Sequence, residues 1–571
     1  MRPHACRTTL FSVLITCVSS LSAQRGAPVT LITGTVVGAD GKPMSIADVH
    51  LGPAAEAGVV AEAKVGPDGR FAIATTQTGA FFLILTGVNN HSASVPLLLD
   101  GRGTRIALDV QLARYHYRDT LDPITAIGDW NHFNFDTGRP LVKQPDGRYA
   151  LEIESTADTV AYQLIGLETD GRSINGTEGV RYQYDGGGDY RSVIKTENGH
   201  ATIVFDPGRL DRRPSERRIT FRDPQSFAAR LATALGEFDR RSRAYFDSAR
   251  AATQRKDSLH YDWTAALREL AARRAGERDP ALSQILLLER LQYALLGAPS
   301  DPGLYAEVAR RIRPTSPAWS FRQLGQPAGM VIAFARMRQP TANRVEAMKD
   351  SVAVGQTLAY LDSVSSRHPA RAVRIDALGS EVFFAKTANR QEQANDLYLR
   401  VMADYGDDPM AAYLRAQFSP NRVLRTSVPV PDFHFAKLAD TTQTFTRTDF
   451  QGKTYLLDFW ASWCGPCIGD MPYLHAAYDS LHAKGLEILS ISLDRDPGDV
   501  TRFVAGQWKM PWLHAFARGG FSNPATRQFE VIFVPRMALV GPDGTILAVD
   551  GDLRGEKLLP TLRRFLSAPA P

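Results

Sequence analysis

The residues of this chain best suited to chemistry are two cysteines near its C-terminal end. Cys464 and Cys467 are separated by Gly465 and Pro466 in the stretch WASWCGPC, residues 460–467. Two thiols at this spacing can form a reversible disulfide, supply half of a metal site, or act as a structural crosslink. A crosslink between them would close a loop of only two intervening residues, which removes little entropy from the unfolded chain. A chemical role is therefore favoured over a stabilising one.

A metal site is the first alternative for the two thiols. Structural zinc needs two further Cys or His ligands at suitable spacing. The chain has no second Cys-x-x-Cys motif, and we expect His475 and His482, on the helix that follows, to point elsewhere. The sequence therefore predicts a redox dithiol and no bound metal.

The position of the dithiol in the predicted secondary structure indicates what each sulfur does. Residues 455–459 read as a buried strand, and residues 464–484 as a helix. The first sulfur then lies at a helix N-terminus, where free amides and the helix dipole favour a thiolate. We predict that Cys464, nearer the helix end and more exposed, attacks the substrate. Cys467, one turn inside, resolves the mixed disulfide.

The elements that must position this site alternate between strand and helix. After the first helix, residues 486–493 read as a strand and 499–508 as a helix. Residues 537–540 and 545–549 then flank a Gly-Pro-Asp-Gly turn. Strands separated by helices predict an α/β sheet, here with an antiparallel hairpin at its end. The proline-rich segment TSVPVP, 426–431, is predicted to be a domain boundary.

FWASWCGPC closely resembles the active-site sequence of thioredoxins. The longer set VPDFHF, DFQGK, LLDFWASWCGPC, MPYL, ISLDRD and VPRMALVGPDG is similar to the TlpA/ResA-like extracytoplasmic thiol–disulfide oxidoreductases. The resemblance implies a thioredoxin fold for residues 427–571 and exchange with protein disulfides or dithiols. It implies no cofactor beyond the redox-active disulfide Cys464–Cys467. A CGPC motif in this family favours reduction, and export would require an electron donor on the membrane side.

The resemblance also implies a substrate-docking surface. Pro535 occupies the place of the family's cis-proline, which faces the Cys-x-x-Cys motif and helps to dock the substrate backbone. A cis bond before proline costs only about 0.5–1 kcal/mol relative to trans. The predicted substrate-binding residues are Val534, Pro535, Trp463, Gly465 and Pro466. Trp460 and Trp463 are expected to shield the rim of the site, by packing or by substrate contact.

A third catalytic residue follows from the same resemblance. Asp458 lies six residues before Cys464, where thioredoxins carry a buried acid and many extracytoplasmic relatives carry Asn. Burial raises the pKa of a carboxyl, so Asp458 could take the proton of Cys467 as it attacks. The alternative is an acid held by hydrogen bonds with no part in proton transfer.

Two further positions are compared with the family. Pro472 matches a helix-kinking proline, and Arg536 departs from the expected small residue. We expect Arg536 to place a cation near the sulfurs.

Two β-rich segments precede this domain. Residues 30–112 resemble the carboxypeptidase regulatory-like β-sandwich, with Gly34-x-Val36, Asp40-x-x-x-Pro43 and Asp68-Gly69-x-Phe71 as the matching pattern. Residues 118–208 resemble early-set immunoglobulin-like modules related to glycogen-binding domains. The aromatic residues Trp130, Phe133 and Phe135 could form a sugar platform. The preferred interpretation is that they fill the core and a turn of a β-sandwich.

Residues 214–424 are predicted to be mainly helical. Asp223-Pro224 and Asp279-Pro280 are predicted helix starts, with Asp as the cap and Pro in the first turn. His368-Pro369 and Asp408-Pro409 each close an apolar helical run, which loosely suggests paired helices of the tetratricopeptide kind. The predicted fold is therefore multidomain: two β-sandwich-like modules, a helical region with TPR-like paired helices and a C-terminal thioredoxin fold.

The N-terminus predicts export. Residues 1–23 begin with the basic residues Arg2 and Arg7, continue with a short apolar run and end in mostly small residues, as in a secretory signal peptide. A lipoprotein signal with a lipid anchor at Cys17 is the less favoured alternative. Removal of this segment would leave only Cys464 and Cys467 in the mature chain, in the periplasm or elsewhere in a bacterial envelope.

Composition and pattern limit the other functions. The formal net charge is only +5, and the basic residues are dispersed, so no nucleic-acid partner is predicted. A thiol peroxidase of the same fold is one alternative, but Ala461 stands where the peroxidatic Thr-x-x-Cys pattern has Thr. A partner- or glycan-binding scaffold with an accessory thioredoxin-like domain is the other. The preferred function is an exported thiol–disulfide oxidoreductase.

Overall fold

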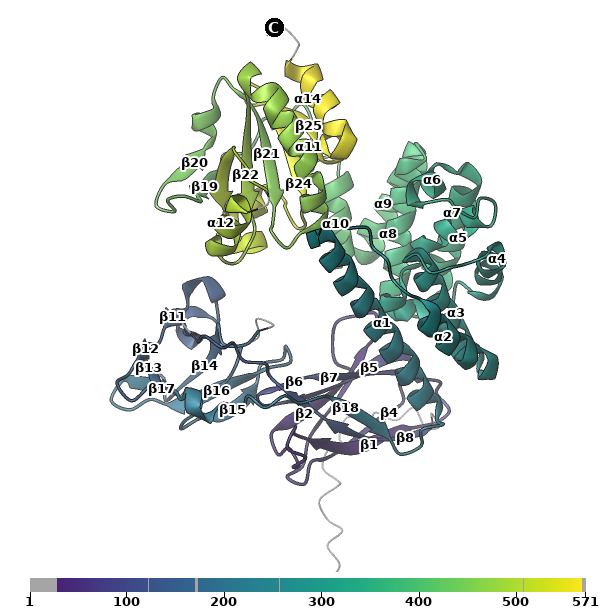
Figure 1. Cartoon of the computed structure of the whole chain (residues 1–571), viewed down its shortest axis with the longest axis vertical. Coiled ribbons are helices and arrows are strands. Elements are labelled where there is room, and N and C mark those ends of the chain that lie inside the picture. The colour runs from purple at the N-terminus through teal and green to yellow at the C-terminus, as the bar shows by residue number, and fades with distance from the viewer. Residues whose placement is uncertain (1–27, 122, 170–172, 256, 507, 567–571) are drawn as a thin grey trace, which may run out of the picture. The chain divides into compact units, whose positions relative to one another are not determined.

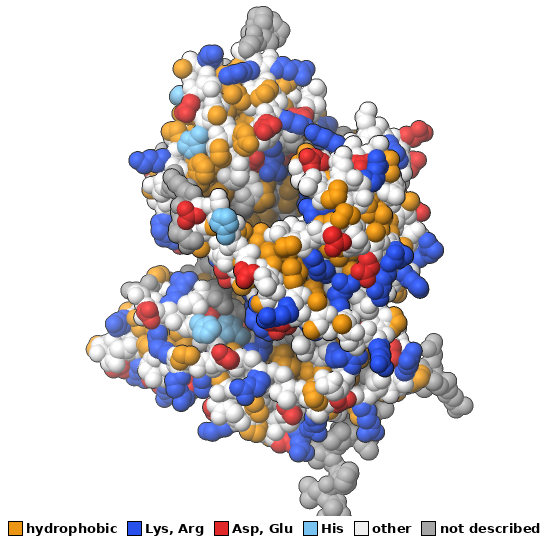
Figure 2. Space-filling view, turned by 45° about the vertical axis from the view of Figure 1, so that its right-hand side comes forward, with side chains coloured by type: hydrophobic (Ala, Val, Ile, Leu, Met, Phe, Trp, Pro, Cys, Tyr) orange, Lys and Arg blue, Asp and Glu red, His pale blue; other side chains and the backbone are white. Residues whose placement is uncertain are grey.

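The structure is a computed structural model of the whole chain, and it describes residues 28–566 except 122, 170–172, 256 and 507. The predicted signal peptide and Cys17 lie outside the described residues. The chain forms two compact units (Figure 1). One falls within Met1–Ala126, Pro140–Gln326 and Pro369–Ala372, and the other within Ile127–Arg139, Pro327–His368 and Val373–Pro571. On the face shown in Figure 2, Lys and Arg side chains are interspersed with Asp and Glu.

The first β segment consists of two four-stranded sheets that share one hydrophobic core. One sheet has the order β18-β8-β1-β4, and the other β3-β2-β5-β7. Alternate residues of β1 are buried, as expected for a strand with one face on a core. The strands are β1 (Thr30–Val37), β2 (Ala47–Pro53), β3 (Ala61–Lys64), β4 (Arg70–Thr75), β5 (Gly79–Gly87), β6 (Asn90–His91), β7 (Ala93–Leu99), β8 (Arg105–Gln111), β9 (Ala113–Arg114) and β18 (Arg218–Phe221).

The last of these strands corrects a sequence prediction. Residues 218–221 were expected to be helical, but β18 pairs antiparallel with β8, with Ile219 opposite Val110. The segment RITF alternates between exposed and half-buried positions, which is the period of a strand. Pairing with a distant edge strand decides this conformation, and only the tertiary structure supplies that partner.

The second β segment has a five-stranded sheet, β11-β10-β14-β16-β15, and a three-stranded sheet, β12-β13-β17. Its strands are β10 (Thr125–Gly128), β11 (Arg139–Pro140), β12 (Val142–Lys143), β13 (Tyr149–Glu154), β14 (Thr159–Ile165), β15 (Arg181–Tyr184), β16 (Tyr190–Lys195) and β17 (His200–Phe205). Trp130 and Phe133 are half-buried and Phe135 is exposed. Their predicted place in the core is therefore wrong, while their predicted place in a turn agrees with the loop of two short 3₁₀ helices in which they lie. The sugar platform stays a prediction.

Ten α-helices occupy most of residues 227–418. They are α1 (Phe227–Arg255), α2 (Thr264–Gly276), α3 (Pro280–Leu295), α4 (Pro302–Arg311), α5 (Met330–Arg336), α6 (Arg344–Lys349), α7 (Ser351–Arg367), α8 (Arg371–Thr387), α9 (Gln391–Tyr405) and α10 (Pro409–Phe418). No helix among the described residues is both long and apolar enough to cross a membrane.

The predicted helix starts are borne out at one of two places. Asp279 caps α3 by accepting hydrogen bonds from the amides of Ala281 and Leu282. Asp408, predicted only to close a helical run, also caps α10 by accepting from the amide of Met410. Asp223-Pro224, in contrast, forms a turn before α1, which begins only at Phe227. The hydroxyl of Ser226 instead accepts a hydrogen bond from Ala229 N–H in the first turn of α1.

The C-terminal domain is a seven-stranded sheet in the order β20-β19-β23-β22-β21-β24-β25. The central strands β21, β22 and β23 are parallel, while β24 and β25 run antiparallel as the predicted terminal hairpin. The helices α11 and α14 lie side by side on the sheet (Figure 1). The elements are β19 (His434–Lys437), β20 (Thr444–Thr446), β21 (Thr454–Trp460), α11 (Gly465–Leu481), β22 (Leu486–Ser492), α12 (Pro497–Ala505), β23 (Leu513–Phe516), α13 (Pro524–Gln528), β24 (Arg536–Val540), β25 (Ile546–Val549) and α14 (Leu558–Leu566).

The predicted boundary at 426–431 is part of the domain rather than a linker. Ser427 N–H donates to Ile546 O, and Val430 N–H donates to Gly544 O. Leu424 is already buried in the core on one face of the sheet. Prolines have no N–H to donate, so the two prolines of this segment suit the edge position that it occupies. Packing of the domain therefore begins before residue 427.

Candidate functional site

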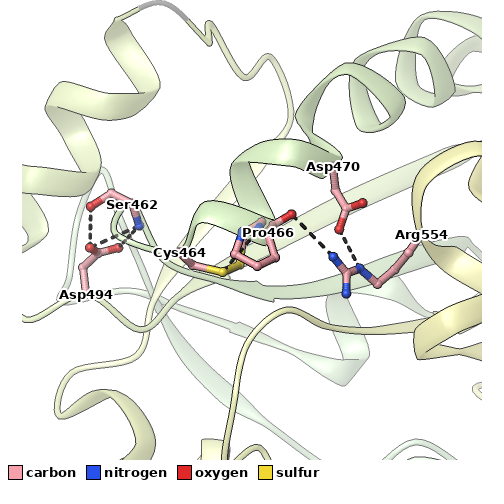
Figure 3. The surroundings of a disulfide bond; sticks show 7 residues. Ser462, Cys464, Pro466, Asp470, Asp494 and Arg554 are labelled. Carbon is pink, nitrogen blue, oxygen red and sulfur yellow. Dashed lines mark hydrogen bonds and ion pairs between the residues drawn. A yellow bond between two sulfur atoms is a disulfide. The ribbon is translucent and has the colours of Figure 1, made fainter. Parts of the chain in front are cut away.

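The two cysteines form a disulfide at the start of α11. The sulfurs are 2.00 Å apart and the Cα atoms 5.3 Å apart. Cys464 is the N-cap of α11, and its Sγ accepts a hydrogen bond from Cys467 N–H at 3.2 Å. A helix N-terminus with amides directed at a sulfur favours its thiolate form. This geometry suits Cys464 to be the nucleophile once the bond is reduced (Figure 3).

Solvent exposure barely separates the two cysteines. Cys464 was predicted to be the more exposed residue and is so only by a small margin, at 4% against 2% for Cys467, so that both are buried. Both side chains belong to the same hydrophobic core, beneath the loop that leads into α11. The predicted distinction between attacking and resolving thiol therefore rests on the N-cap position of Cys464 rather than on solvent exposure.

Asp458 lies on β21, in the strand that leads to the dithiol, and is 1% exposed. Desolvation by burial raises the pKa of this carboxyl to about 7, and a hydrogen bond from Ser490 opposes that rise. Such a carboxyl exchanges its proton near neutral pH, which a general base requires. The structure thus places a titratable acid in the strand beside the dithiol core.

Two residues that sequence reasoning did not identify hold Asp458 in place. The hydroxyl of Ser490 donates to Asp458 Oδ2 at 2.8 Å, and Trp512 Nε1–H donates to Ser490 Oγ at 2.9 Å. Because the serine oxygen accepts from the indole, its single proton is directed at the carboxylate. Asp458 and Ser490 are direct partners on β21 and β22. The sequence signal was a serine between two apolar residues, Leu489 and Ile491, in the mainly apolar strand LEILSISL.

The predicted docking proline lies at the start of β24. The peptide bond Val534–Pro535 is cis, as the family resemblance implies. Pro535 is buried, and Val534 packs against the core that contains both cysteines. The structure therefore packs Val534 on the core of the dithiol, and the contact of Val534 and Pro535 with substrate remains a prediction.

The two tryptophans of the motif have different positions. Trp463 is 59% exposed beside Cys464, and its ring centroid is 6.4 Å from that of Phe521. Gly465 and Pro466 are also exposed. Trp460, expected at the rim, is fully buried and packs against Phe503. The prediction for Trp460 was wrong because it ends β21 on the face that carries the core under α11.

Arg536 is not near the sulfurs as expected. Successive residues of a strand point to opposite faces of the sheet, and Met537 belongs to the core that holds the dithiol. Arg536 therefore projects to the other face, where its Nε forms an ion pair with Asp550 Oδ1 at 2.8 Å. Its charge is neutralised away from the dithiol, so it does not stabilise the Cys464 thiolate directly.

Two buried carboxylates fix the backbone on either side of the disulfide (Figure 3). Asp494 accepts hydrogen bonds from the backbone N–H and the hydroxyl of Ser462, at 3.0 and 2.6 Å, in the loop before Cys464. Asp470 on α11 forms an ion pair with Arg554 at 2.7 Å. Arg554 also reaches the carbonyl of Pro466, at 3.5 Å. None of these positioning residues was identified from the sequence, although the motifs ISLDRD and MPYL lie on or next to two of them.

Comparisons with known proteins match the C-terminal domain. The Redoxin family model matches residues 425–550. The thiol-disulfide oxidoreductase ResA of Bacillus thuringiensis subsp. konkukian is 31% identical over 123 residues, which cover 22% of this chain and 67% of that protein. ResA of Oceanobacillus iheyensis is 35% identical over 86 residues, covering 15% of this chain and 45% of its own.

Solved structures give the same kind of match. The thioredoxin domain of a thiol-disulfide oxidoreductase from Bacteroides vulgatus is 28% identical and covers 25% of this chain and 99% of its own, with a TM-score of 0.23. A putative thiol:disulfide interchange protein DsbE from Chlorobium tepidum is also 28% identical, with the same coverage and a TM-score of 0.22.

The similarity to ResA extends over two thirds of that protein's length. The two cysteines form a disulfide at a helix start, and the same domain contains the cis peptide bond Val534–Pro535. Through its C-terminal domain, this chain belongs to the TlpA/ResA-like thiol–disulfide oxidoreductases of the thioredoxin fold.

Proposed function

We propose that this protein is an exported thiol–disulfide oxidoreductase that reduces or exchanges disulfides in extracytoplasmic proteins of a bacterial envelope. The observation that carries the proposal is the Cys464–Cys467 disulfide at the N-terminus of α11, in the same domain as a buried acid of raised pKa. Export is supported by the signal-like residues 1–23 and by the resemblance to an extracytoplasmic family.

The first step uses the reduced enzyme and forms a mixed disulfide. The Cys464 thiolate attacks one sulfur of the substrate disulfide, so a bond forms to Cys464 Sγ and the substrate S–S bond breaks. The other substrate sulfur leaves as a thiolate and takes a proton from solvent. The amide of Cys467, 3.2 Å from Cys464 Sγ, stabilises the attacking thiolate.

The second step releases the substrate. Asp458 accepts the proton of Cys467, and the Cys467 thiolate attacks Cys464 Sγ and breaks the mixed disulfide. The released substrate sulfur takes up a proton, so the substrate has gained two electrons and two protons. The enzyme is left as the Cys464–Cys467 disulfide. A base with a pKa of about 7 suits this proton transfer near neutral pH.

Substrate contact is proposed for five residues around Cys464: Val534, Pro535, Trp463, Gly465 and Pro466. Exposed Gly465 and Pro466 leave room for an approaching chain, and the exposed indole of Trp463 offers an apolar surface with a polar edge. A thiol donor on the membrane side would return the oxidised enzyme to the dithiol.

The proposal is tested by trapping. Cys467→Ser should accumulate mixed disulfides between Cys464 and envelope proteins, which dithiothreitol releases and mass spectrometry identifies. The double variant Cys464→Ser/Cys467→Ser is the control and should trap nothing. Equal capture by the double variant would contradict the mechanism. A measured reduction potential near that of strong oxidants, roughly −120 mV, would overturn the proposed reducing direction.

A further inference from the structure

The loop that precedes the cis-proline is held by residues outside the thioredoxin fold. We call residues 530–535 the docking loop, and residues 409–425, which comprise α10 and the segment after it, the brace. The Redoxin match begins only at residue 425, so nearly all of the brace precedes it. The ring of Tyr413 on α10 lies 4.7 Å, centroid to centroid, from the ring of Phe533 in the docking loop.

A second contact joins the same two segments through the backbone. The amide N–H of Val423 donates to Glu530 Oε2 at 2.9 Å. Glu530 has a φ of 53°, a left-handed conformation that few residues with a side chain adopt. A residue in such a conformation depends on its surroundings to keep it there. The brace therefore supplies part of what holds the start of the docking loop.

The contact continues from Phe533 to the residue after the cis-proline. The guanidinium of Arg536 lies 5.0 Å from the centroid of the Phe533 ring and forms the ion pair with Asp550. Arg536 is 1% exposed, and both of its Nη atoms are without a hydrogen-bond partner among the described residues. Phe533 and Asp550 thus fix this side chain, and Tyr413 in turn packs on Phe533.

Charged side chains of the brace interact with charged side chains of the redox domain at this junction. Burial and the nearby cations Arg536 and Arg425 lower the pKa of Arg422 in the brace, while Asp550 and Glu530 act against that change. Three cations and two carboxylates therefore lie close together, with two of the cations in the brace and the other three groups in the redox domain. Attraction between the brace cations and the two carboxylates favours contact between the segments more than a single exposed pair does.

We propose that the brace positions the docking loop for protein substrates, with Tyr413 as the positioning residue. This inference depends on the proposed disulfide-exchange function and adds a determinant of substrate class to it. A small disulfide has only to reach Cys464 Sγ. A protein disulfide must also place its backbone against Val534 and Pro535. Disorder in the docking loop therefore weakens the binding of protein disulfides and leaves the reaction with small disulfides unchanged.

The experiment compares two disulfides on the full chain. Insulin is the protein substrate, turned over with dithiothreitol, and 5,5′-dithiobis(2-nitrobenzoate) is the small one, reacted with pre-reduced enzyme. Tyr413→Ala should raise KM for insulin roughly three- to tenfold, the range expected for loss of one aromatic pair. The rate with the small disulfide, and the equilibrium constant for reduction of the dithiol, should remain within twofold of the unmodified protein.

Matched variants separate positioning from folding. Tyr413→Phe keeps the ring and should retain the normal KM for insulin. Tyr398→Ala truncates another half-buried tyrosine that packs on the same helical core, and should leave that KM unchanged. If Tyr413→Ala does not fold, Phe533→Leu removes the same ring contact from the side of the docking loop.

Two results would overturn the proposal. One is an unchanged KM for insulin in Tyr413→Ala. The other is an equal loss with both disulfides, which would mean that the helix supports the whole domain and not docking. Failure of the unmodified, reduced protein to react with either disulfide would instead refute the proposed function itself.

Discussion

The redox domain and the helical region each bury one carboxyl group in nearly the same electrostatic setting. Asp458 on β21 is 1% exposed and Glu381 on α8 is 3% exposed. Desolvation raises the pKa of each to about 7, and one serine hydroxyl donates to each carboxylate. The Ser490 and Ser365 oxygens lie 2.8 and 2.7 Å from their respective carboxylate oxygens.

What separates the two sites is the presence of a reacting group. Asp458 lies in the strand that ends at the dithiol loop, and Trp512 further orients its serine partner. Glu381 lies in a helical region without cysteine, where the charge of Asp362 adds to its pKa shift and that of Arg400 opposes it. A perturbed pKa thus marks burial in both regions. Catalysis is proposed only for Asp458, because only its domain contains thiols.

The largest expected effect is one that both sites share. Between about pH 4 and pH 7, each of these carboxyl groups is protonated in the folded state and ionised in the unfolded state. The free energy of unfolding therefore falls as pH rises through that window. Asp458→Asn should therefore stabilise its domain by up to about 4 kcal/mol at pH 8, and Glu381→Gln its region by about 3 kcal/mol. At pH 4 both gains should nearly vanish.

Amide hydrogen exchange measured separately in β21 and α8, at pH 4 and at pH 8, resolves the two regions. Variants that are equally less stable at both pH values would show that these acids stabilise the fold when ionised. That result would remove the basis of the comparison.

The second effect should break the symmetry between the two acids. Asp458→Asn removes the base for Cys467 and should slow resolution of the mixed disulfide on the order of 100-fold near pH 7, within the range for general base catalysis. Glu381→Gln should leave that step within twofold. Single-turnover stopped-flow kinetics with reduced enzyme and insulin measures it. If Asp458→Asn resolves at the normal rate, the acid is structural and the two sites are equivalent.

The smallest effect concerns the serine partners. Ser490→Ala removes a hydrogen bond to the ionised form, so the pKa of Asp458 should rise by about one pH unit, and Ser365→Ala should do the same to Glu381. Carboxyl ¹³C NMR titration reports both. Trp512→Phe keeps an apolar ring but frees the serine oxygen, and should raise the pKa of Asp458 by less. A fall in either pKa would contradict the assigned hydrogen-bond directions.

The local chemistry of the redox site could be predicted from the sequence. The strand before the dithiol, the helix after it, the proline within that helix at Pro472 and the terminal hairpin all depend on local pattern or on near neighbours. The cis peptide at Pro535 followed from the family resemblance. Each of these features depends on residues close in sequence or on a motif that forces one conformation.

The errors share a different cause. Trp460 was expected at the rim and Arg536 near the sulfurs. In both strands, the register of the sheet decides which face a side chain points to, and neither residue alone reveals that register. The strand β18 was missed because its partner β8 lies far away in the chain. The small margin between Cys464 and Cys467 in exposure likewise depends on packing by residues distant in sequence.

The sequence alone therefore determined the type of chemistry, because two thiols with this spacing, between a strand and a helix, have few other uses. Only the tertiary structure decided how that chemistry is tuned and held. The hydroxyl of Ser490 reaches Asp458 from a neighbouring strand, Asp494 and Arg554 fix the ends of the dithiol loop, and Tyr413 packs on the docking loop from a helix. These contacts join residues that lie far apart in the chain. Their distances depend on how helices and sheet pack, and no local pattern encodes that.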